Sequence, residues 1–144
     1  MRRWVFFVWL LPLFLAGCRV CKPIESQTEY PVVIEVQIVH HLGEAKEQRQ
    51  YKTAENISMV LNYLRLIKLE GVPQEDPMSQ GGGLYHIILI RSDGSQVEYV
   101  QKADRYLWRP TGGWQMINKD QAPQLGQLFR ALPSDQSIMG TIPG

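Results

Sequence analysis

One apolar stripe in residues 53–70 constrains the fold of this chain more than any other feature. Apolar side chains recur there at i, i+3, i+4, i+7 and i+10, which predicts a helix with one continuous hydrophobic face: Ile57, Val60, Leu61, Leu64 and Ile67. Thr53 is a favourable N-cap, and Gly71 followed by Pro73 predicts the end of the helix. So broad an apolar face needs a large apolar surface to lie on, and a sheet provides one.

Most of the remaining sequence is typical of short strands. In residues 31–41, Val32, Ile34, Val36 and Ile38 alternate with more polar side chains, so we expect this even-numbered set to face the core. A second helix is predicted at 121–132, because its leucines and Phe129 have helical spacing and Pro133 ends it. The other strands are predicted at 45–52, 84–91, 96–101, 105–109 and 114–117.

The Ser-Asp-Gly-Ser sequence at 92–95 predicts a tight hairpin between two of these strands. Asp-Gly accepts the positive φ angles that a two-residue turn demands. Such a turn pairs Ile90 with Val97, and it leaves Ile87 and Val100 together on the opposite face of the hairpin.

The predicted order of elements is therefore ββ-α-ββββ-α. Successive hairpins favour antiparallel pairing, so we expect an α+β fold in which two helices pack on an antiparallel sheet. One domain is predicted over residues 31–133, followed by a C-terminal tail at 134–144.

The first 18 residues have the three parts of a secretion signal. Arg2 and Arg3 are basic, residues 4–15 are almost wholly apolar, and Leu15-Ala16-Gly17-Cys18 places small residues before a cysteine. The apolar run is shorter than the roughly 20 residues of a membrane-spanning helix. This segment resembles the signal of bacterial lipoproteins, in which the cysteine becomes the lipid-bearing N-terminus. The resemblance implies a signal peptide at 1–17, lipidation of Cys18, and a tether at 18–30.

Lipidation at Cys18 would place the protein on the extracytoplasmic face of the cell membrane, held there by acyl chains. The tether is short enough to keep the domain within about 40 Å of the membrane. Cys21 would then have no intramolecular partner, so we expect the fold to rest on its apolar core without a disulfide.

The charge balance excludes one class of partner. Without Arg2 and Arg3, 13 of the 15 basic residues remain against 14 acidic ones, which is a net charge of −1. Because no basic stripe is present, we expect no nucleic-acid partner.

The three histidines do not predict a metal site. His40 and His41 are adjacent on a strand, so their side chains should point to opposite faces of the sheet. His86 could approach His40 only if their strands are neighbours. A zinc site also needs further ligands, which the neighbouring sequence does not offer. We therefore expect no metal and no cofactor.

Catalysis is not predicted either. The sequence has no Gly-x-Ser-x-Gly nucleophile elbow, and the glycines at 81–83 lack the Lys-Ser/Thr ending of a phosphate loop. Glu75 and Asp76, or Glu35 and Glu98, could pair as carboxylates, but such pairs are ordinary in a β-rich domain. A hydrolase is the least favoured hypothesis.

An aromatic segment is the best candidate for a binding site. Tyr106 and Trp108 share one face of a predicted strand, and Trp114 follows one hairpin turn later. Aromatic clusters can stack on sugars or bind a partner protein. The alternative is that these side chains form the core beneath the helices.

A second candidate is an apolar patch on the central hairpin, formed by Tyr85, Ile87 and Leu89 together with Val100. If both helices cover one face of the sheet, we expect this patch to be exposed on the other, where it would mark an interaction site. If the helices lie on both faces, the patch becomes core.

The region after the signal resembles small lipoproteins of Gram-positive gut bacteria. The resemblance rests on the Asp-Gly hairpin, the strand at Arg105-Tyr106-Leu107 and the Gly-Gly-Trp turn, and it implies no particular activity. The favoured function is a membrane-anchored binding module for an envelope protein or glycan. The alternative is a structural or assembly lipoprotein of an envelope complex.

Overall fold

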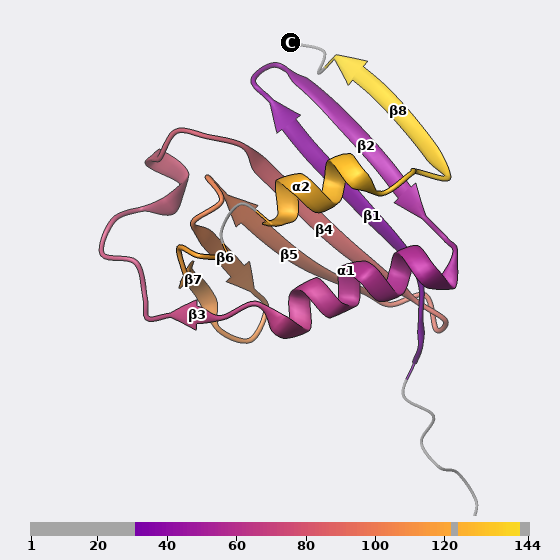
Figure 1. The fold of residues 1–144 in the computed structure, drawn as a ribbon, viewed down its shortest axis with the longest axis horizontal. Helices are drawn as coiled ribbons and strands as arrows, with labels where there is room; N and C mark the ends of the chain where they lie inside the picture. Colours follow the sequence, from indigo (N-terminus) through magenta and orange to yellow (C-terminus); the bar gives the residue numbers. More distant parts are fainter. Residues whose placement is uncertain (1–30, 122–123, 142–144) are drawn as a thin grey trace, which may run out of the picture.

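Eight strands form one antiparallel sheet, and both helices lie on the same face of it (Figure 1). The computed structural model describes residues 31–121 and 124–141. The class is α+β, as predicted from the sequence. In spatial order the strands are β3 (Leu69–Glu70), β7 (Gly113–Ile117), β6 (Tyr106–Arg109), β5 (Gln96–Lys102), β4 (Leu84–Arg91), β1 (Val33–Leu42), β2 (Ala45–Tyr51) and β8 (Gln136–Thr141).

The two helices carry the chain across the sheet in opposite directions. α1 (Ala54–Leu66) leads from β2 on one side of the sheet to β3 at the far edge. α2 (Gln124–Ala131) leads back from β7 to β8 at the other edge. Neither of these two described helices is long and apolar enough to cross a membrane.

α1 begins where the sequence predicts and ends earlier. The hydroxyl of Thr53 accepts a hydrogen bond from the amide of Asn56 at 3.4 Å, as expected of an N-cap. The helix stops at Leu66 and not at residue 70, because the chain turns extended at Ile67. The amide of Lys68 then donates to the side chain of Gln121, at 2.6 Å. Contacts with a distant segment therefore override the local helical pattern.

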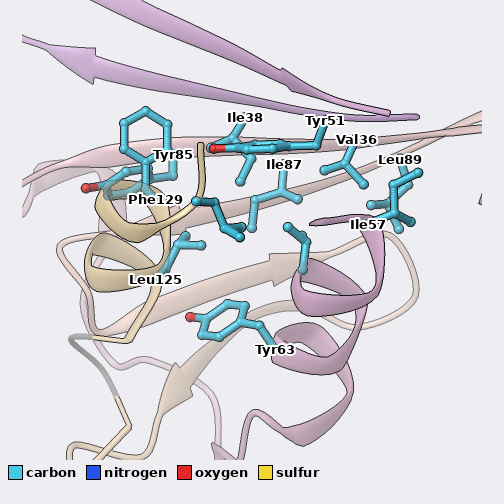
Figure 2. Close-up of a cluster of buried hydrophobic side chains, with 12 residues drawn as sticks. Val36, Ile38, Tyr51, Ile57, Tyr63, Tyr85, Ile87, Leu89, Leu125 and Phe129 are labelled. Atoms are coloured by element: carbon cyan, nitrogen blue, oxygen red, sulfur yellow. The ribbon is translucent and has the colours of Figure 1, made fainter. Parts of the chain in front are cut away.

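The core lies between the helices and the sheet (Figure 2). β1 and β4 contribute aliphatic side chains that meet Ile57 of α1 and Leu125 of α2. A series of hydrogen-bonded polar side chains lies beside them. The hydroxyl of Tyr63 donates to Gln101, and the amide of Gln101 donates to Asp104 at 3.2 Å. Burial raises the pKa of Tyr63. The polar atoms of the Gln101 side chain are satisfied by these hydrogen bonds inside the core.

The β4–β5 hairpin forms where predicted, but the predicted register is wrong by one residue. Gly94 donates to the carbonyl of Arg91, and the amide of Arg91 donates to the carbonyl of Ser95, both at 3.0 Å. With Gly94 at a φ of 81°, the loop has three residues, a turn followed by a bulge. The loop pairs Ile90 with Gln96, so alternate β5 side chains face the helices: Val97, Tyr99 and Gln101. One residue of slip exchanges the two faces of β5.

β1 contains a second irregularity, a bulge between Val33 and Glu35. Beyond the bulge, Val36 and Ile38 are completely buried, as expected. Before it the alternation is broken, and Ile34 is 51% exposed. The even-numbered apolar set is therefore a single face only on one side of the bulge.

The segment predicted as a C-terminal tail contains a strand. β8 pairs antiparallel with β2 along its whole length. The turn before it is held by the segment that joins β2 to α1: the side chain of Asn56 donates to the carbonyl of Pro133 at 3.2 Å, and the backbone amide of Lys52 donates to the carboxylate of Asp135 at 2.6 Å.

The β5–β6 turn holds two non-glycine residues, Ala103 and Asp104, in the left-handed region. Ala103 has a φ of 54°, and Arg105 donates to Lys102 at 3.0 Å to close the turn. This conformation costs an L-residue roughly 1–2 kcal/mol, so Ala103→Gly is expected to raise the free energy of unfolding by about 1 kcal/mol. Urea denaturation checks the result. The reverse change, Gly94→Ala at a φ of 81°, is expected to lower it, and equal effects of the two variants would contradict the turn geometry.

Candidate functional site

The sheet face opposite the helices carries both tryptophans of the described chain. Trp108 of β6 pairs directly with Trp114 of β7, and it also pairs with Val100 of β5. Leu107, the neighbour of Trp108, is completely buried among residues on the helix side. Because side chains alternate along a strand, Trp108 and its two partners lie on the open face.

These three side chains line a shallow hollow of about 320 Å³. Its other lining residues are His86 of β4, Glu98 of β5 and Met78. Met78 belongs to a short 3-10 turn, η1 (Pro77–Ser79), in the long loop between β3 and β4. Asp76 caps this turn by accepting a hydrogen bond from the amide of Met78 at 3.0 Å. The loop therefore brings a thioether side chain to the rim of an aromatic hollow.

The polar part of the hollow is a histidine–carboxylate pair. Nδ1 of His86 lies 2.6 Å from Oε1 of Glu98. His86 pairs with Val100 and Glu98 with Ile88, so the two polar residues are diagonal neighbours on adjacent strands. They share a face only because the three-residue turn shifts the register. The carboxylate can accept hydrogen bonds from a ligand, since its side chain is 47% exposed.

His41 lies beside this pair. Its ring centre is 5.2 Å from that of His86, and the two rings are tilted by 59°. Burial lowers the pKa of His41, and the neighbouring His86 and Lys46 lower it further. The neutral form of the His41 imidazole is therefore favoured relative to that of a free histidine.

His40 lies on the helix side of the sheet, as the alternation with His41 predicts. Its ring stacks on Tyr85 with centres 4.0 Å apart and planes 6° apart, and it meets Phe129 edge-on. Burial lowers the pKa of His40, although the charge of Glu47 acts in the opposite direction. His86 is thus close to His41 and not to His40, the partner that the sequence analysis considered.

The expected exposed patch at Tyr85, Ile87 and Leu89 does not exist. All three side chains are buried in the core beneath the helices. The two helices lie on one face, as the patch hypothesis required, but they lie on the face that carries these residues (Figure 2). Only Val100, the fourth member of the expected patch, lies on the open face.

Tyr106 shares the open face with Trp108 but does not line the hollow. It is buried opposite Met116 of β7, with the guanidinium of Arg105 5.7 Å from its ring centre. Of the predicted aromatic cluster, two members form the hollow and the third packs beside them. Met78 had no sequence signal, because the fold of a long loop is not encoded in a periodic pattern.

The glycines at 81–83 contact another turn. Gly82 lies against the backbone of Ala103, and the amide of Ala103 donates to the carbonyl of Gly83 at 2.8 Å. Within residues 31–121 and 124–141, no three His, Cys, Asp or Glu side chains are placed to hold a metal ion together. Cys18, the predicted lipidation site, and Cys21, which is expected to have no disulfide partner, lie outside the described residues.

Comparisons of the chain with protein-family models, with curated proteins and with solved structures give no match.

Proposed function

We propose that this protein is a lipid-anchored, extracytoplasmic binding module that holds a saccharide in the hollow of its open sheet face. One observation carries the proposal: Trp108 and Trp114 lie side by side in a hollow that also presents Glu98 and His86. The apolar faces of sugar rings can stack on indoles, while sugar hydroxyls can donate to a carboxylate. A mainly apolar hollow with few convergent polar groups is the usual form of a small-molecule site.

The size of the hollow favours binding to a short part of a larger polymer. Its volume of about 320 Å³ is at the lower end of ligand sites, which span roughly 300–1,000 Å³. Such a volume accommodates one or two sugar rings, and the open rim lets a chain of sugars continue past it. Anchoring at Cys18 through a short tether would keep this site close to the membrane, within reach of envelope glycans.

A protein partner is the second candidate, on a separate observation. The loop between β3 and β4 presents Val72, which is 72% exposed, and Met78, which is 49% exposed. Apolar side chains held out on one loop beside an aromatic surface can bind another protein. This surface would suit a structural or assembly lipoprotein of an envelope complex.

Tryptophan fluorescence tests the saccharide proposal directly. The four tryptophans of the chain are Trp4, Trp9, Trp108 and Trp114, so the chain from Cys18 onwards contains only the two that line the hollow. Titration of the mature protein with cell-wall oligosaccharides is expected to change its emission. Trp108→Ala is expected to abolish binding measured by calorimetry, because the stacking surface is lost.

Val72→Ala is the matched control, since Val72 lies in the same loop as Met78 but does not line the hollow. This variant should bind saccharide as well as the unmodified protein. Two results together would reject the saccharide proposal in favour of a protein partner. The parent protein would bind no saccharide, and Val72→Ala would lose a membrane partner that crosslinks to the parent protein.

A further inference from the structure

We propose that His41 and His86 bind a divalent transition-metal ion, with Zn²⁺ as the representative case, and that Glu98 orients the His86 ring for this role. This inference goes beyond saccharide binding and does not depend on it. It rests on the positions of three side chains on two pairs of neighbouring strands, β1 with β4 and β4 with β5.

The separation of the two rings fits a shared ion. Zinc–nitrogen bonds are about 2.0–2.1 Å, so two imidazoles on one tetrahedral ion have their ring centres about 5 Å apart. The observed separation of His41 and His86 is 5.2 Å. The planes of the two rings are tilted by 59°, so the rings are not in parallel stacking.

The carboxylate of Glu98 completes a known pattern of metal-site chemistry. A histidine that binds a metal through one ring nitrogen usually donates its other N–H to a carboxylate or carbonyl oxygen. Nδ1 of His86 is 2.6 Å from Oε1 of Glu98, which leaves Nε2 as the ligand atom. Glu98 is thus a positioning residue that sets the tautomer and ring angle of His86.

The backbone holds the pair in place without the ion. His41 pairs with Leu84 and His86 pairs with Val39, so the histidines are diagonal neighbours on two central strands. Both rings are only partly buried, so an ion can reach them from solvent. With two protein ligands, water completes the coordination, and the affinity should be below that of a four-ligand structural site.

One nearby charge opposes a cation. Lys46 pairs directly with His41 across β1 and β2, so its ammonium group lies on the same face. Removing that charge should strengthen metal binding. This expectation is useful because a variant that gains affinity cannot be explained by damage to the fold.

Calorimetric titration of the full-length protein with Zn²⁺ tests the proposal. One ion per chain is expected. His41→Asn and His86→Asn should each lose binding, and Glu98→Gln should weaken it about 10- to 100-fold, as for other residues that orient a ligating histidine. Lys46→Gln should bind more tightly than the parent protein.

His40→Phe is the control. It removes the imidazole next to His41 in sequence, which lies on the helix side of the sheet, and phenylalanine keeps an aromatic ring stacked on Tyr85. It should bind Zn²⁺ as the parent protein does. No heat of binding from the parent protein, or equal affinity in His86→Asn and His40→Phe, would overturn the proposal. Saccharide binding measured with a chelator present is independent of both results, so failure of one proposal does not imply failure of the other.

Discussion

Truncation of Ile87 to alanine is expected to lower the free energy of unfolding by about 2–5 kcal/mol, the usual cost of deleting a large buried aliphatic side chain. Ile87 is completely buried at the centre of the core, where it pairs with Ile38 of β1 and Tyr99 of β5. Its removal leaves a cavity that the helices above cannot close without moving away from other contacts. Urea denaturation followed by far-ultraviolet circular dichroism measures the change.

Ile88→Ala is the matched control. The same residue type, one position further along β4, lies on the open face and is only partly buried. Its truncation should cost clearly less than that of Ile87. Equal or reversed costs would contradict the assignment of the two faces, and with it the location of the tryptophan hollow.

Cys18→Ser is expected to abolish acylation of the protein entirely. Serine lacks the thiol on which the proposed lipid would be built. The variant should therefore incorporate no labelled fatty acid and should not accumulate as a membrane-bound mature protein. Metabolic labelling with a fatty-acid analogue, followed by fractionation of cells, measures both effects.

Cys21→Ser is the control, since it removes the only other thiol in the chain. It should remain labelled and membrane-bound. Label that survives in Cys18→Ser, or is lost in Cys21→Ser, would contradict lipidation at Cys18. Saccharide binding by an unlabelled variant would show that the hollow works without the anchor.

Much of the fold could be predicted because local patterns are strong where the elements form. The stripe in α1, its Thr53 cap and the Asp-Gly turn are each visible within a few residues. The predicted register of β4 and β5 was wrong by one residue, because a three-residue loop and a two-residue loop share the same Asp-Gly signal. The pairing of β8 with β2 was not predicted, because it depends on residues far away in sequence.

The location of the site depends on which face of the sheet the helices cover, and the sequence of β4 alone does not predict this face. Besides His86, one face of β4 carries three aliphatic residues, Leu84, Ile88 and Ile90, and the other face carries Tyr85, Ile87 and Leu89. Which face the helices cover is decided by all the strands together, including the polar faces of β1 and β2. The sequence could therefore predict that Trp108 and Trp114 lie close together, and not that they lie in the open.

The position of β8 has a consequence for the timing of folding. Both helices and every other strand precede it, yet it joins the sheet next to β2, which forms near the start of the domain. Pairings between segments so distant in sequence form slowly, because a long loop must close first. A chain that is synthesised N-terminus first leaves the outer edge of β2 unpaired until β8 appears. During that interval, β2 is the edge most open to a chaperone, or to wrong pairing with a second chain.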